Sequence, residues 1–200
     1  DFFDELFSAM KKNNLSPAAF KPNIGYYTIY DKPYEGQFLG SLALAKTITL
    51  IKDYFGDVPI ILDTKRGDIA TSSLNYAKEA FDVWKSDAVT VSPYMGNDSI
   101  MPFIEGFTDN GVYLLTRTSN KGGEDFQDLL ISSKNEDDIP LEQLYIKVAK
   151  KILFYNQKGI HIGAVLGATK PNELTCIAQV FKQIQPSNVP LLIPGVGSQG

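Results

Sequence analysis

A group of charged residues follows a short apolar run in the segment 59–72. The apolar residues 60–62 predict a strand that is buried on both faces. Because side chains alternate along a strand, Asp63 and Lys65 are expected to point to the same side. Asp68 follows at a position where the start of a helix favours a carboxylate. An ordinary ion pair beside a helix cap fits this pattern, but active sites of α/β proteins are also built at the ends of parallel strands.

A second lysine, Lys21, ends another predicted strand at 18–23. In a barrel of parallel strands all carboxyl-terminal strand ends open on one face, so Lys21 is expected to neighbour Asp63 and Lys65. Together with Asp68 they form an array of alternating charge in which the pKa of each group depends on its partners. Such an array can keep a lysine protonated and directed at one atom, as general-acid catalysis requires. A solvated strand end is the alternative for Lys21 taken alone.

The loop 194–200 is rich in glycine and follows the last predicted strand. Backbone N–H groups of glycines can approach an anion closely, and barrels commonly bind phosphate with their last loops. Gln199 adds a neutral hydrogen-bond donor for a phosphate oxygen. Ser119 and Asn120, at the end of another strand, offer groups that could contact a polar heterocycle. A simple turn is the alternative for both segments.

Strands and helices alternate regularly along the chain. Strands are predicted at 18–23, 60–62, 88–91, 111–116, 162–166 and 189–193, and helices at 1–14, 35–54, 69–84, 99–107, 141–157 and 171–184. This alternation indicates parallel strands joined by right-handed crossovers. Since no glycine fingerprint follows the first strand, a (β/α)8 TIM barrel is favoured over a doubly wound open sheet. We expect residues 1–200 to form a single TIM-barrel domain that lacks the first and last strands of the barrel. The polar, acidic segment 121–138 is expected to be a solvated surface loop without a catalytic role.

The composition excludes several classes of partner. The chain has 200 residues, 44% of them hydrophobic, and a net charge of −4, so neither nucleic acid nor an anionic membrane is an expected partner. No apolar run approaches the roughly 20 residues of a membrane span. Cys176 is the single cysteine and cannot form an internal disulfide, which favours a reducing, cytoplasmic setting. His161 is the only histidine and is interpreted as structural, and the sequence contains no evident metal-binding cluster.

The segment 63–69, Asp-Thr-Lys-Arg-Gly-Asp-Ile, resembles the Asp-x-Lys-x-x-Asp signature of the orotidine 5′-phosphate decarboxylases. Four further motifs, in family order, resemble the branch that includes many bacterial and some protozoal enzymes. They lie at 20–23 (Phe-Lys-Pro-Asn), 92–96 (Ser-Pro-Tyr-Met-Gly), 117–120 (Arg-Thr-Ser-Asn) and 194–200 (Pro-Gly-Val-Gly-Ser-Gln-Gly). Related sugar-phosphate decarboxylases share the first signature, whereas the motifs at 20–23 and 194–200 point to the orotidylate branch.

This resemblance implies a carboxy-lyase that converts orotidine 5′-phosphate to UMP and CO2 in de novo pyrimidine biosynthesis, without a cofactor or metal. It implies that Lys21 binds the ribose and supports Asp63, which would lie against the substrate carboxylate. Lys65 would protonate C6 of the pyrimidine as CO2 leaves. The enzyme would be a homodimer with shared active sites, in which Asp68 reaches into the partner's site and holds a ribose hydroxyl.

The resemblance also implies substrate contacts for six further residues: Asn23, Ile69, Ser72, Ser119, Pro194 and Gln199. Ile69 would accompany Asp68 across the dimer, Ser119 would contact the pyrimidine edge, and Gln199 would contact the 5′-phosphate. Ser72 stands where the family usually has threonine and keeps the hydroxyl. The family's first-strand aspartate and last-strand phosphate arginine match no residue of this sequence.

Two other functions fit parts of this pattern. A metal-dependent sugar-phosphate decarboxylase or epimerase of the same barrel superfamily would hold a divalent metal near Asp63 and Asp68. A non-catalytic barrel would bind a phosphorylated ligand without releasing CO2. The complete set of two lysines and two aspartates favours catalysis over binding alone.

Overall fold

Five parallel strands form the central sheet of the computed structural model, which describes residues 2–132, 141–183 and 189–197. The strands are β1 (Ile61–Arg66), β2 (Ala88–Val91), β3 (Gly111–Arg117), β6 (Ile162–Leu166) and β7 (Leu191–Leu192). Their spatial order is β1-β2-β3-β6-β7, which follows the chain and never reverses. A doubly wound sheet would reverse its order at a switch point. The sheet therefore has the strand order of a barrel, and it is open within the described residues.

The predicted strand at 18–23 is present only as two parallel bridges. Phe20 pairs with Ile60, and Asn23 pairs with Asp63. These bridges hold the segment along the edge of β1 that β2 does not occupy, so the lysine between Phe20 and Asn23 lies beside β1.

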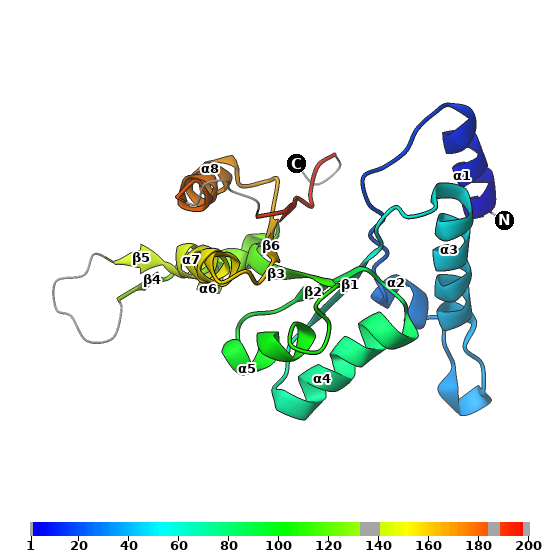
Figure 1. The fold of residues 1–200 in the computed structure, drawn as a ribbon, viewed down its shortest axis with the longest axis horizontal. Coiled ribbons are helices and arrows are strands. Elements are labelled where there is room, and N and C mark those ends of the chain that lie inside the picture. The colour runs from blue at the N-terminus through cyan, green and yellow to red at the C-terminus, as the bar shows by residue number, and fades with distance from the viewer. Residues whose placement is uncertain (1, 133–140, 184–188, 198–200) are drawn as a thin grey trace.

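The helices lie outside the sheet. They are α1 (Phe2–Lys12), α2 (Gly25–Thr28), α3 (Leu39–Phe55), α4 (Ala70–Lys78), α5 (Asn97–Ile100), α6 (Glu124–Gln127), α7 (Leu144–Gln157) and α8 (Pro171–Phe181). Figure 1 shows α3, α4, α5, α7 and α8 fanned around the strands, while a small hairpin of β4 (Leu130–Ile131) and β5 (Glu142–Gln143) projects from one end. Each helix between two parallel strands serves as the crossover that the alternating pattern predicts.

The core lies between the sheet and these helices because the apolar residues recur at the spacing of each element. Every residue of β2 and of β6 is buried, as expected for strands that are covered on both faces. In α3 the buried side chains of Leu44, Ile48, Ile51 and Phe55 recur every three or four residues and form one stripe that joins the hydrophobic core.

Some helix limits differ from the sequence prediction. α3 begins at Leu39 rather than at 35, because a 3-10 turn (Pro33–Glu35) ends at Gly36, whose φ is +67°. Short turns of other helical types continue two helices: Glu79–Val83 (π) after α4 and Met101–Phe103 (3-10) after α5. β7 is shorter than the predicted 189–193.

The segment 121–138 is only partly described. Its described part is mostly exposed, as predicted, but it contains regular secondary structure and is not a simple loop. A 3-10 turn (Lys121–Gly123), α6 and the β4–β5 hairpin form there, while 133–138 lies outside the described residues. The segment covers Arg117 at the end of β3, which is only 1% exposed. The guanidinium of Arg117 donates to Gln127 Oε1 at 3.1 Å and to Asp128 Oδ2 at 3.1 Å. The chain after β3 is therefore attached to the sheet through a buried charge.

Candidate active site

Asp63 lies at the centre of a group of hydrogen bonds near the carboxyl end of β1. Its Oδ1 accepts from Lys65 Nζ at 2.6 Å and from Thr90 Oγ1 at 2.8 Å. Its Oδ2 accepts from Lys21 Nζ at 2.9 Å and from Asn23 Nδ2 at 3.2 Å. The Asp63 side chain is 6% exposed, whereas those of Lys21 and Lys65 are 32% and 48% exposed. Four donors fill the acceptor sites of the carboxylate, and both ammonium groups stay accessible to a ligand.

These donors set the charge state of Asp63. Burial alone would raise the pKa of Asp63, because it disfavours the charged form. Hydrogen bonds from Lys65, Lys21 and Thr90 outweigh burial and lower the pKa from 3.8 to about 2. Asp63 is therefore ionised at neutral pH. Two lysines against one aspartate leave a net positive charge, which suits an anionic ligand.

The strand β1 contains a bulge at residues 63–65, the segment that carries Asp63 and Lys65. Leu62 is the last residue in regular register, so that 63–65 lie opposite the single residue Thr90 of β2. Lys65 has a φ of +48°, in the left-handed region that residues other than glycine rarely adopt. The contact between Asp63 and Lys65 confirms the prediction that they lie side by side, although a bulge and not a regular strand brings them together. The bulge turns the lysine toward the carboxylate.

Thr90 is a part of this site that the sequence reasoning missed. It is the one polar residue of the apolar strand 88–91, and it is 1% exposed. A buried hydroxyl requires a hydrogen-bond partner, and the neighbouring strand carries the charged segment. A threonine at this register position is the signal that could have revealed it.

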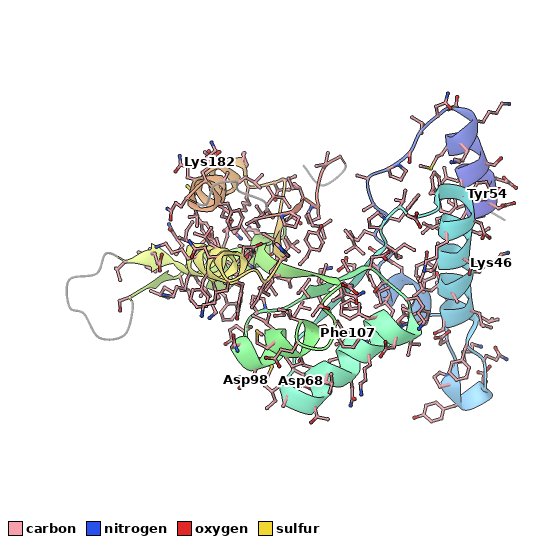
Figure 2. All side chains as sticks on the ribbon, in the orientation of Figure 1. Lys46, Tyr54, Asp68, Asp98, Phe107 and Lys182 are labelled. Carbon is pink, nitrogen blue, oxygen red and sulfur yellow. The ribbon has the colours of Figure 1, made fainter. Side chains whose placement is uncertain are left out.

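Asp68 lies apart from the group around Asp63. Figure 2 labels Asp68 at the start of α4, beside α5. Its Oδ1 accepts from the backbone N–H of Ile69 at 2.7 Å, and in the part of the chain that the structure describes it forms no ion pair. The predicted helix cap is wrong, because the residue that precedes α4 is Ile69 and no side chain caps the helix. Ile69 is 50% exposed and Ser72 is also exposed. One chain therefore brings together three of the four members of the predicted array.

Ser119 lies in a closely packed turn after β3. Thr169 Oγ1 donates to the backbone carbonyl of Ser119 at 2.9 Å. A Cβ atom on Gly167 would lie 2.6 Å from both Cα and N of Ser119, so only glycine fits there. Asn120 Oδ1 instead accepts from Thr118 Oγ1 at 2.6 Å. The turn is thus held in place from β3 and from the end of β6.

The glycine-rich loop after β7 has the backbone that its composition predicts. Gly195 and Gly197 have φ values of +96° and +100°, which favour glycine. The carbonyl of Pro194 accepts from the backbone N–H of Ala168 at 2.8 Å, next to the segment that packs on Ser119. Gln199 lies outside the described residues.

Among residues 2–132, 141–183 and 189–197, no three His, Cys, Asp or Glu side chains are grouped so that they could hold a metal ion. His161, predicted to be structural, is exposed just before β6. None of the helices in the described ranges has the length and apolarity needed to cross a membrane.

The family model described as "Orotidine 5'-phosphate decarboxylase / HUMPS family" matches residues 2–200 of this chain. The chain belongs to this family. Curated relatives named orotidine 5′-phosphate decarboxylase include those of Cupriavidus taiwanensis and Herpetosiphon aurantiacus, at 43% and 40% identity over 91% of the chain. The chain spans about 60% of the length of these relatives, with 59% and 60% of them covered.

Solved structures from the same family have the same fold. The Leishmania donovani OMP decarboxylase superposes with a TM-score of 0.76 at 32% identity, over 98% of this chain and 68% of that one. A Toxoplasma gondii structure titled a putative orotidine-monophosphate-decarboxylase gives a TM-score of 0.80 at 30% identity, over 100% of this chain and 67% of that one. The TIM-barrel prediction is confirmed by this family, and the described strands form an open part of that barrel.

Proposed function

We propose that this protein is a carboxy-lyase that decarboxylates orotidine 5′-phosphate to UMP and CO2 in de novo pyrimidine biosynthesis. Membership of the family and the names of its relatives support this substrate. The observation that carries the proposal is the ionised carboxylate of Asp63 held between two accessible ammonium groups, those of Lys21 and Lys65. Such a centre can bind an anion and deliver a proton at one fixed position.

Lys65 acts as the general acid in the proposed reaction. The bond between C6 and the carboxylate carbon breaks, CO2 leaves, and the electron pair stays on C6. The Lys65 ammonium then gives its proton to C6, and solvent restores that proton. Stabilisation of the carbanion by the ammonium is the main contribution that we assign. Asp63 lies against the substrate carboxylate, and Lys21 binds the ribose and supports Asp63.

The remaining assignments come from the motifs. Substrate contacts are proposed for six residues: Asn23, Ile69, Ser72, Ser119, Pro194 and Gln199. The enzyme works as a cytoplasmic homodimer, in which Asp68 and Ile69 of one subunit complete the site of the other. The exposure of Ile69 and the absence of an ion pair at Asp68 within the described part of its own chain are consistent with this arrangement. We assign residues 1–200 to a single TIM-barrel domain.

A metal-dependent decarboxylase or epimerase is the second candidate. It would need a free lone pair on Asp63 for a divalent cation. All the acceptor sites of that carboxylate are filled, and two of its donors are ammonium groups, which repel a cation. The donor set therefore fits metal-free chemistry better.

The substitution Lys65→Ala in the full-length protein tests the proposal. UMP and CO2 formation from orotidine 5′-phosphate should fall by at least about a thousandfold, because the proton donor and its charge are both lost. Lys147→Ala is the control, since Lys147 is similarly exposed (51%) and faces Glu142 away from the site. Near-parental turnover in the Lys65→Ala protein would exclude the mechanism.

A chelator assay separates the two enzyme candidates. The parent protein should keep full activity on orotidine 5′-phosphate in excess EDTA. Activity that EDTA abolishes and added divalent metal restores would favour the metal-dependent alternative.

A further inference from the structure

The bulge in β1 leaves two backbone N–H groups without partners in the ladder between strands. They belong to Thr64 and Lys65, and both point at the hydroxyl of Thr90 on β2. The Thr64 N–H lies 3.1 Å and the Lys65 N–H 3.0 Å from Thr90 Oγ1. Thr64 Oγ1 in turn donates to the Thr90 carbonyl at 3.1 Å. Thr90 therefore replaces the missing part of the ladder.

The direction of the Thr90 hydroxyl proton follows from these contacts. A threonine hydroxyl has two acceptor sites and one proton. The two N–H groups occupy the acceptor sites, so the proton is free only for the remaining neighbour, Asp63 Oδ1, at 2.8 Å. One buried oxygen is thus bonded both to the backbone that carries Lys65 and to the carboxylate that Lys65 contacts.

We propose that Thr90 is a positioning residue, which fixes the left-handed backbone of Lys65 and the orientation of the Asp63 carboxylate so that the ammonium stays directed at the reacting atom. The inference rests on the proposed function, since it concerns the same lysine. Backbone in the left-handed region is unfavourable for a lysine and persists only where surrounding contacts hold it. Asp63 also receives bonds from Lys21 and Asn23, but those reach Oδ2. Oδ1 receives bonds from Lys65 Nζ and from Thr90 Oγ1, and Thr90 also binds the backbone of the bulge.

The substitution Thr90→Val tests this inference in the full-length protein, because valine keeps the shape of threonine and removes the hydroxyl. We expect kcat to fall roughly 10- to 100-fold, the effect of losing a hydrogen bond to a charged group, with KM changed less than about threefold. Thr90→Ser should recover most of kcat, since it restores the hydroxyl. A crystal structure of the Thr90→Val protein should show Lys65 relaxed from φ of +48° and its Nζ moved away from Asp63.

Thr116→Val is the matched control. Thr116 is a buried threonine of the next strand, 2% exposed, and its hydroxyl donates to the carbonyl of Leu114. Equal losses of kcat in the Thr90→Val and Thr116→Val proteins, or an unchanged contact between Lys65 and Asp63 in the Thr90→Val crystal structure, would overturn the inference. If the Thr90→Val protein does not fold, Thr90→Ala replaces it in the comparison, since alanine also lacks the hydroxyl and does not place a methyl group at its position. An inactive parent protein would refute the proposed function, and the crystal structures would still decide on Thr90.

Discussion

The ammonium of Lys65 lies 2.6 Å from the carboxylate of Asp63, although only one residue separates them and Lys65 has a left-handed backbone. In a regular strand the Cα atoms of residues i and i+2 lie roughly 6 to 7 Å apart, and their side chains run parallel on one face of the sheet. Here three residues occupy the space opposite one residue of β2, and the extra length brings the lysine onto the carboxylate. The site therefore depends on a local irregularity that the neighbouring strand stabilises.

The lowered pKa of Asp63 predicts how stability depends on pH. Because the folded-state pKa of about 2 lies below the ordinary value of 3.8, the unfolded chain binds the proton more readily. The bonds to Asp63 should thus contribute about 2 kcal/mol to the free energy of unfolding above pH 4, and this contribution is lost as the pH falls toward 2. Urea unfolding between pH 3 and 7 measures it.

Asp63→Asn and Asp57→Asn form the comparison for this measurement. Asp57 is an exposed aspartate just after α3. The Asp57→Asn protein should follow the parent's pH dependence, whereas the Asp63→Asn protein should lose less stability between pH 5 and pH 3 than the parent does. Identical pH dependence of all three proteins would contradict the role given to Asp63.

The close packing of Gly167 on the backbone of Ser119 leads to a second prediction. A methyl group at Gly167 would meet the backbone of Ser119 at 2.6 Å, and backbone cannot move aside as a side-chain end can. Gly167→Ala should lower the free energy of unfolding by about 1 to 3 kcal/mol. It should also raise KM for the proposed substrate, orotidine 5′-phosphate, if Ser119 makes the contact that we propose. Gly106→Ala is the control, because a Cβ there meets nothing within 4 Å. Thermal unfolding and steady-state kinetics that do not differ between the two variants would show that the turn tolerates the shift.

Mixing two inactive proteins tests whether subunits share active sites. In a mixed dimer of Lys65→Ala and Asp68→Ala subunits, one site would have both residues intact and the other neither. Random mixing gives half mixed dimers, so about a quarter of the parental activity should return. No recovery after subunit exchange, checked by mass measurement of mixed dimers, would place Asp68 in the site of its own chain.

The sequence alone determined the class of fold and three members of the charged centre, Lys21, Asp63 and Lys65. The fourth predicted member, Asp68, lies apart from them within one chain. Buried strands such as 88–91 and 162–166 can be predicted because they consist mainly of β-branched and small apolar residues. The crossover helices can be predicted because their apolar residues recur every three or four positions. Lys21 and Asp63 could be paired in advance, since consecutive parallel strands are neighbours in a barrel. Family motifs identified the same residues.

Only the tertiary structure decided how those residues are held. The bulge at 63–65 exists because Thr90, on another strand, accepts the N–H groups that the ladder cannot pair. Local sequence does not encode such a long-range bond. For the same reason the sequence did not reveal that the exposed segment after β3 is attached to the sheet, where Arg117 binds its Gln127 and Asp128. Spacing along the chain specifies which side chains are available, whereas contacts between distant segments determine where each one points.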